Sequence, residues 1–128
     1  LAKIVPKPNG NTALYRTIVA GYKYMKQTYK PDMMNSILLL TDGMNDEGSP
    51  GAGPTLKATL ATLAKLSDPQ RPIQVIMIGF GKGVDPKELN AIAGVTQGGA
   101  YVAYTPQQVQ DIFLQAISKR ICAPKCSN

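Results

Sequence analysis

The chain has 128 residues, of which 44% are hydrophobic and 17% are charged, and this composition predicts a single globular domain over residues 1–128. It contains no histidine, which excludes Ser-His-Asp and Cys-His nucleophile systems as well as imidazole metal ligands. A metal ion would have to bind oxygen ligands, which select hard cations such as Mg²⁺, Ca²⁺ or Mn²⁺. No apolar run approaches the roughly 20 residues that span a bilayer, so we expect no membrane insertion by this segment.

The formal net charge is +6, from 14 basic and 8 acidic residues. Most basic residues are scattered along the chain. The one local run, Lys23, Lys26 and Lys30, falls on one face of a predicted helix and is typical of a solvated surface. Two Phe, six Tyr and no Trp offer few rings on which bases could stack, so we expect no nucleic-acid partner.

The first half of the chain predicts a helix, a strand and a loop. Apolar residues at steps of three and four predict an amphipathic helix from Thr12 to Tyr29. The run from Ser36 to Thr41 has no polar alternation, which predicts a central parallel strand buried on both faces. Gly, Pro, Asn, Asp and Ser are frequent from Met44 to Pro54, which indicates an exposed loop.

The second half continues the alternation of helix and strand. We predict a helix from Thr55 to Leu66, a strand from Ile73 to Ile78, a helix that begins near Asp85 and Pro86, a strand from Ala100 to Tyr104, and a helix from about Thr105 to Arg120. Asp85 is a good N-cap, and Pro86 suits the first helical position. The apolar face of the last helix comprises Val109, Ile112, Phe113, Ala116 and Ile117.

Alternating helices and strands with short connections predict an α/β fold, with a parallel sheet flanked by helices on both faces in a Rossmann-like arrangement. Ligands of such sheets bind beyond the carboxyl ends of the strands. The loops after Thr41, Ile78 and Tyr104 should therefore meet at one edge.

Two polar residues stand out at that edge. Asp42 follows the apolar run, and a carboxylate there is costly unless it accepts hydrogen bonds or holds a cation. Thr12 places a hydroxyl at a helix start, where it could cap the helix or bind a ligand.

Several short motifs occur in a characteristic order: Gly10-Asn11-Thr12-Ala13-Leu14, Ile37-Leu38-Leu39-Leu40-Thr41-Asp42-Gly43, Val75-Ile76-Met77-Ile78-Gly79-Phe80-Gly81, Glu88-Leu89-Asn90-Ala91-Ile92-Ala93 and Gly98-Gly99-Ala100-Tyr101. Together they cover Gly10 to about Leu114 and resemble the von Willebrand factor type A (VWA) domain. Asn35-Ser36 and Asn45-Asp46 add a resemblance to bacterial cell-surface proteins in which this domain follows a solute-binding domain.

The resemblance implies a non-enzymatic binding or adhesion module of an exported bacterial protein, at the cell surface or outside the cell. It implies a divalent-cation site in which the Thr12 hydroxyl binds the metal or its water and Asp42 acts through water. Gly43, Asn45 and Asp46 would form the loop that contacts a protein or extracellular ligand.

The sequence also departs from that family. Its main metal motif, Asp-x-Ser-x-Ser, is absent, and only Leu1 to Asn9 stand where the family has three more strands and a helix. We therefore expect the C-terminal part of such a domain, with Mg²⁺ (or Ca²⁺ or Mn²⁺) bound weakly or not at all by the isolated chain. Without those strands, Ser36 to Thr41 would form an open apolar edge that favours self-association.

Other functions fit the residues less well. A Mg²⁺-dependent phosphoryl hydrolase could use Asp42 as its nucleophile and Asp46 as a second acid. A dinucleotide fingerprint would need glycine at Val84, and the chain has no P-loop motif. A third interpretation is a scaffold segment that binds nothing itself.

Two cysteines, Cys122 and Cys126, lie in a C-terminal tail of residues 121–128. A zinc site needs four ligands, which makes zinc improbable. Free thiols would fit a cytosolic protein and a small disulfide loop an exported one, and the resemblance favours the disulfide.

Overall fold

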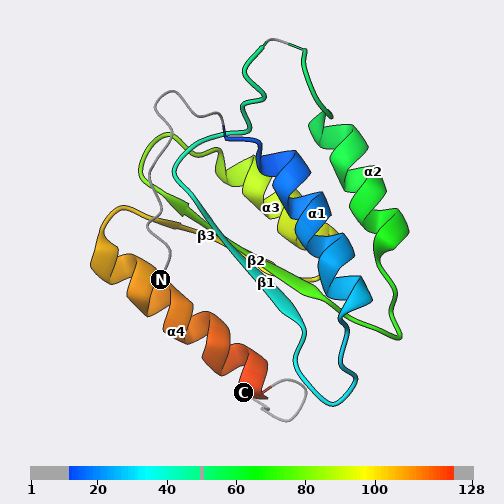
Figure 1. Ribbon diagram of the computed structural model, residues 1–128. Coiled ribbons are helices and arrows are strands. Elements are labelled where there is room, and N and C mark those ends of the chain that lie inside the picture. The colour runs from blue at the N-terminus through cyan, green and yellow to red at the C-terminus, as the bar shows by residue number, and fades with distance from the viewer. Residues whose placement is uncertain (1–11, 50, 123–128) are drawn as a thin grey trace, which may run out of the picture.

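A computed structural model describes residues 12–49 and 51–122, and the side chains of 117 and 119–122 lie outside that description. The elements are α1 (Leu14–Gln27), β1 (Ser36–Thr41), α2 (Leu56–Leu66), β2 (Gln74–Phe80), α3 (Pro86–Val95), β3 (Gly99–Ala103) and α4 (Pro106–Cys122). The strands form one parallel sheet in the order β1-β2-β3, which confirms the predicted α/β class (Figure 1).

Local capping signals explain where two helices begin. The Thr55 hydroxyl accepts a hydrogen bond from the Ala58 N–H at 3.1 Å at the start of α2. Asp85 Oδ1 accepts from the Lys87 N–H at 2.9 Å, and Pro86 occupies the first turn of α3. These short-range bonds satisfy N–H groups that have no partner within the helix, as the sequence predicted for Asp85 and Pro86.

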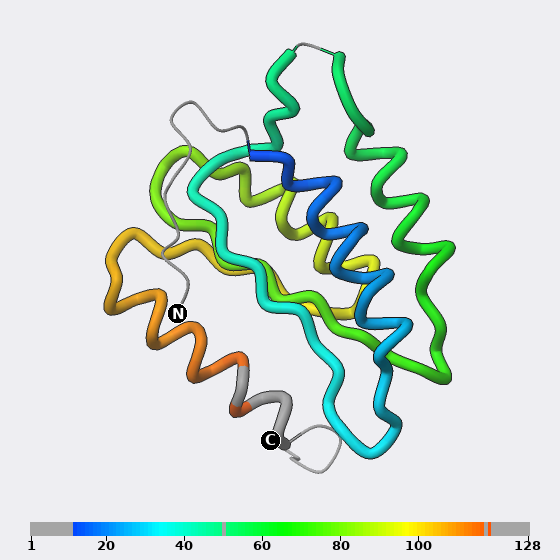
Figure 2. The backbone as a smooth tube through the Cα atoms, viewed as in Figure 1, coloured from blue at the N-terminus to red at the C-terminus, as the bar shows by residue number. Residues whose placement is uncertain are grey.

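Helices cover both faces of the sheet, with α1, α2 and α3 on one side and α4 on the other (Figures 1 and 2). Strand β2 shows how the faces divide. Val75 and Met77 belong to the cluster on the α1 and α3 side, whereas Ile76 and Ile78 pack with Ala116 of α4. The two clusters follow directly from the alternation of side chains along a strand.

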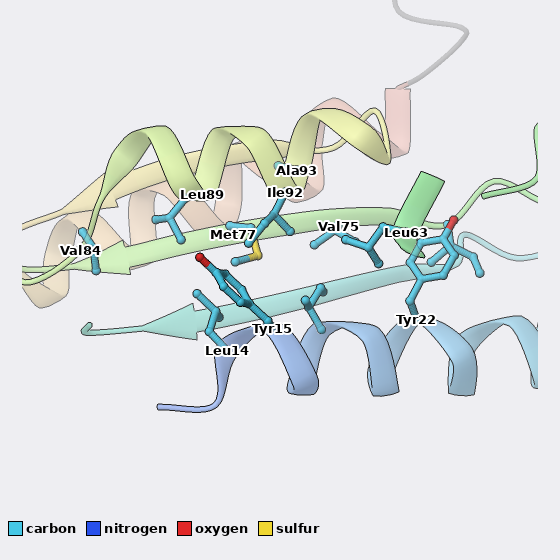
Figure 3. Close-up of a cluster of buried hydrophobic side chains, with 12 residues drawn as sticks. Leu14, Tyr15, Tyr22, Leu63, Val75, Met77, Val84, Leu89, Ile92 and Ala93 are labelled. Carbon is cyan, nitrogen blue, oxygen red and sulfur yellow. The ribbon is translucent and has the colours of Figure 1, made fainter. Parts of the chain in front are cut away.

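The larger cluster lies between the sheet and three helices (Figure 3). Its fully buried members include Ile18 and Tyr22 of α1, Leu63 of α2, and Leu89 and Ile92 of α3. Burying each such side chain contributes about 1.5–3 kcal/mol. The cluster fixes α1 and α3 against the strands, which places the loops at the carboxyl edge of the sheet.

The prediction that Ser36 to Thr41 is a central, doubly buried strand is wrong. Strand β1 pairs only with β2 among the described residues, and Leu38 and Leu40 are 46% and 58% exposed. The central strand is β2. Helix α4 contacts β2 and β3, so one face of β1 stays uncovered by the helices that the structure describes. An apolar run shows that a strand is suited to burial. Whether its side chains are buried depends on which helices pack against the strand.

The predicted apolar face of the last helix is also only partly correct. Val109, Ile112 and Ala116 belong to the cluster on the sheet, but Phe113 is 38% exposed and is not a member of it. The side chain of Ile117 lies outside the described residues. No described helix is long and apolar enough to cross a membrane.

Candidate functional site

Thr12 and Asp42, the two predicted site residues, lie at the carboxyl edge of the sheet. Thr41 is the last residue of β1 and pairs with Gly79 of β2, so Asp42 begins the loop beyond the strand. Thr12 precedes α1 and lies beside that loop. A methyl group on Gly43 would lie 3.8 Å from Thr12 Oγ1. The fold therefore brings the hydroxyl next to the segment that carries the carboxylate.

Thr12 does not cap α1. The N-cap position is Ala13, which makes no side-chain cap bond, and Asn45 Oδ1 accepts the Tyr15 N–H at 2.9 Å instead. The Thr12 carbonyl accepts from the N–H groups of Leu14 and Asp46, each at 2.7 Å. The Thr12 backbone is thus fixed, while within residues 12–49 and 51–122 its hydroxyl forms no hydrogen bond.

The carboxylate of Asp42 is exposed and has no hydrogen-bond or ion-pair partner in the described part of the chain. Because the carboxylate is exposed, it does not carry the desolvation cost that was expected from the sequence for a buried aspartate. The loop after β2 lies against the backbone of Asp42, because a methyl group on Gly83 would lie 2.8 Å from the Asp42 carbonyl oxygen. The loops after β1 and β2 therefore meet, as predicted.

The three predicted contact residues have different surroundings. Gly43 is half-buried beside Thr12. Asn45 is turned inward, since its side chain caps α1. Asp46 is exposed, and its Oδ1 accepts the N–H of Gly48 at 2.8 Å, which closes a tight turn in the loop. Of the three, Asp46 presents a charge to solvent.

An ion pair that sequence reasoning missed anchors the same loop. Glu47 Oε2 lies 2.8 Å from Arg16 Nε of α1, and the Glu47 side chain is only 7% exposed. Its other oxygen, Oε1, is buried with no described partner. A side chain at Gly53 would collide with Glu47, so the loop closes over the carboxylate. No local signal reveals this pair, because 31 residues separate its members.

Tyr15 and Glu88 form a buried polar contact behind the loops. Burial raises the pKa of Tyr15, and a hydrogen bond to the Glu88 carboxylate raises it further. Glu88 is 6% exposed and lies in the first turn of α3. The Tyr15 side chain extends from α1 toward α3 (Figure 3), so this contact joins two helices that flank the site.

The described residues do not build a complete cation site. They hold no group of three or more Asp, Glu, Cys or His side chains placed to hold a metal. Thr12 and Asp42 offer two oxygen ligands, whereas Mg²⁺ takes about six and Ca²⁺ six to eight. The backbone of Cys122 ends α4, but its side chain and Cys126 lie outside the described residues, as does the predicted disulfide.

Comparison with solved structures gives one informative match. A structure titled "von Willebrand factor type A from Catenulispora acidiphila" aligns with a TM-score of 0.61 and 25% identity over 84% of this chain. The predicted resemblance to a VWA domain is confirmed. The chain spans only 22% of the length of that matched chain. No family model and no curated protein matches this sequence.

The VWA-type fold indicates a binding or adhesion module in general, because VWA domains typically mediate protein interactions and do not catalyse reactions. In this chain, the edge with Thr12 and Asp42 is where parallel α/β sheets bind ligands.

Proposed function

We propose that this chain belongs to a non-enzymatic binding module of an exported bacterial protein, in which Thr12 and Asp42 contribute to recognition of a protein or extracellular ligand. One observation carries the proposal. Asn45 caps α1 in place of Thr12, which leaves the Thr12 hydroxyl without a hydrogen-bond partner in the described chain, beside the loop of the exposed Asp42.

The two side chains supply hard oxygen ligands, one neutral and one charged. That chemistry suits Mg²⁺, Ca²⁺ or Mn²⁺ rather than a soft metal. Two ligands are too few for tight binding, so other groups must complete the site, and we expect an affinity of about millimolar for the chain alone. The confirmed fold supports a binding role, and the resemblance to bacterial surface proteins supports an extracellular or cell-surface location.

Paramagnetic broadening by Mn²⁺ tests this site without a known partner. Mn²⁺ titrated into ¹⁵N-labelled protein should broaden first the amide signals of Thr12, Asp42 and Gly43. Asp42→Asn should abolish that broadening. Asp111→Asn is the matched control, because Asp111 is an exposed acid on α4, away from the loops.

Three outcomes would overturn the proposal or its details. Equal broadening in wild type and Asp42→Asn would exclude Asp42 as a ligand. Broadening centred on Asp46 and Glu47 would move the site into the loop. Binding tighter than about 10 μM would contradict the incomplete site, since two ligands cannot provide that affinity.

A further inference from the structure

A surface groove lies between helices α1 and α2, which pack side by side (Figure 1). Its volume is about 520 Å³, which is within the usual range of ligand sites. The residues of α1 and α2 that line it are Arg16, Val19, Ala20, Lys23, Thr59 and Thr62. Neither Thr12 nor Asp42 lines this groove, so it is a second surface, separate from the candidate site at the carboxyl edge.

The two helices that form the groove carry basic residues and no acidic residue. Their basic residues are Arg16, Lys23, Lys26, Lys57 and Lys65. Two carboxylates lie close to these helices, and both are already paired: Glu47 with Arg16, and Asp68 with Arg71. The pair of helices is therefore positively charged and favours an anionic partner.

The guanidinium of Arg16 is held in place and keeps donors for a second carboxylate. Its Nε donates to Glu47 Oε2 at 2.8 Å, which ties the side chain to the loop after β1. Its two Nη groups form no hydrogen bond within residues 12–49 and 51–122. Because the side chain is already ordered, a further carboxylate can bind with a smaller loss of side-chain entropy.

Lys23 supplies a second cation in the same groove. Its side chain is exposed and forms no ion pair in the part of the chain that the structure describes. Seven positions separate it from Arg16, which corresponds to about 10.5 Å along the helix axis. Val19 and Ala20 lie between the two on the same side of α1. The groove thus presents a cation, a small apolar stretch and a second cation in that order.

This order is complementary to an acidic amphipathic helix. Residues i, i+3, i+4 and i+7 of a helix share one side, and helices that dock into grooves use these positions as anchors. Acids at i and i+7 are about 10.5 Å apart along their helix, which matches the spacing of Arg16 and Lys23. Apolar side chains at i+3 and i+4 then face Val19 and Ala20.

We propose that the groove between α1 and α2 binds an acidic amphipathic helix of a partner protein. Two of its carboxylates pair with Arg16 and Lys23, and two apolar side chains enter the groove between them. A second copy does not supply this helix, because none of the four described helices has two acids seven residues apart. The aliphatic stretch between the cations offers no ring for base stacking, which disfavours a nucleic acid.

A designed peptide titrated into the ¹⁵N-labelled full chain tests this inference. The peptide has about 20 residues, with Glu at i and i+7, Leu at i+3 and i+4, and Ala and Gln elsewhere. The amide signals of Val19, Ala20, Lys23 and Thr62 should shift most. Added NaCl should weaken the binding, because contacts between exposed charges are screened. No Mn²⁺ is present, and Asp42→Asn should bind the peptide as the wild type does.

Exposed residues provide variants that keep the fold. Lys23→Glu should weaken peptide binding by about fivefold or more. Lys87→Glu makes the same charge change on α3, outside the groove, and should weaken it by less than about twofold. Ala20→Glu, which places an acid in the apolar stretch, should also weaken binding. A peptide in which one Glu is replaced by Lys should bind Lys23→Glu better than it binds the wild type.

Three results would overturn the proposal. Equal losses for Lys23→Glu and Lys87→Glu would show attraction by net charge alone. Equal binding of a peptide with the same composition but its leucines opposite its glutamates would show that the groove is not filled. Tighter binding of single-stranded DNA at the same amides would identify a nucleic acid as the partner. None of these results bears on Mn²⁺ binding at Asp42.

Discussion

The side-chain oxygen of Asn45 accepts a hydrogen bond from the backbone N–H of Tyr15 at 2.9 Å, across 30 residues of sequence. Helix α1 has no side-chain cap of its own, because Ala13 occupies its N-cap position. A residue of the loop after β1 thus satisfies a free N–H of the first turn. The same bond holds the loop against the helix that carries Thr12.

We predict that Asn45→Ala lowers the free energy of unfolding by about 1 kcal/mol, the usual effect of losing a helix cap. Asn45→Asp should retain most of the stability, because a carboxylate also accepts this bond and is favoured at a helix N-terminus. Urea denaturation measures both. Asn90→Ala is the control, since Asn90 is an exposed helix residue that bonds only within α3. A loss for Asn45→Ala no larger than for Asn90→Ala would contradict the capping role.

The pair Arg16–Glu47 should contribute more than the exposed pair Arg71–Asp68. Both have short N–O distances, 2.8 and 3.0 Å, but the Glu47 side chain is 7% exposed and the Asp68 side chain 28%. Arg16→Met leaves a buried carboxylate unpaired and should cost about 1–2 kcal/mol. Arg71→Met should have little effect, because exposed ion pairs contribute little to stability.

A double-mutant cycle identifies the cause of the Arg16 effect. In a Glu47→Gln background the buried side chain is neutral, so Arg16→Met should cost much less than in the wild type. Thermal or urea unfolding of the four proteins gives the coupling free energy. If Arg16→Met costs the same in both backgrounds, the arginine acts through its aliphatic packing rather than through Glu47.

Sequence reasoning succeeded where the signal was local. We could predict the start of α3 at Asp85 and Pro86 and the bounds of β1. In both cases the signal, a helix cap or an apolar run, consists of residues that are adjacent in the sequence. Sequence reasoning failed where the outcome depends on distant segments. Leu40 is exposed because α4 does not reach β1, and Glu47 is buried because Arg16, 31 residues earlier, lies opposite it. The position of Thr12 and Asp42 at the carboxyl edge could be predicted, whereas the capping role of Asn45 could not.

Two glycines near the end of α3 should respond in opposite directions to alanine. A methyl group on Gly98 would collide with the backbone of Val75 in β2, whereas one on Gly94 would meet nothing within 4 Å. Gly98→Ala should therefore destabilise the protein by about 3 kcal/mol or more, since backbone must move. Gly94→Ala should stabilise it by about 0.5–1 kcal/mol through helix propensity. Denaturation midpoints that shift in the same direction would contradict this close packing of β2 and the α3–β3 turn.

The buried phenol of Tyr15 should make stability fall at high pH. Burial and the Glu88 carboxylate raise the pKa of Tyr15 in the folded protein above its unfolded value of about 10. The fold therefore favours the protonated phenol, and the stability that this preference adds is fully present below pH 10. As the pH rises above 10, the unfolded chain loses its proton first, and this stability is lost.

Urea denaturation at pH values from about 8 to about 11.5 tests whether the free energy of unfolding falls as the Tyr15 phenol ionises. The free energy of unfolding of wild type should fall more steeply above pH 10 than that of Tyr15→Phe, because phenylalanine cannot ionise. Tyr104→Phe is the control, since Tyr104 is 59% exposed, and its pH profile should follow the wild type. The phenolate absorbance of Tyr15 should appear only as the protein unfolds. If the free energy of unfolding depends on pH in the same way in wild type and Tyr15→Phe, ionisation of the phenol is not coupled to folding. The contact between Tyr15 and Glu88 would then not stabilise the packing of α1 against α3.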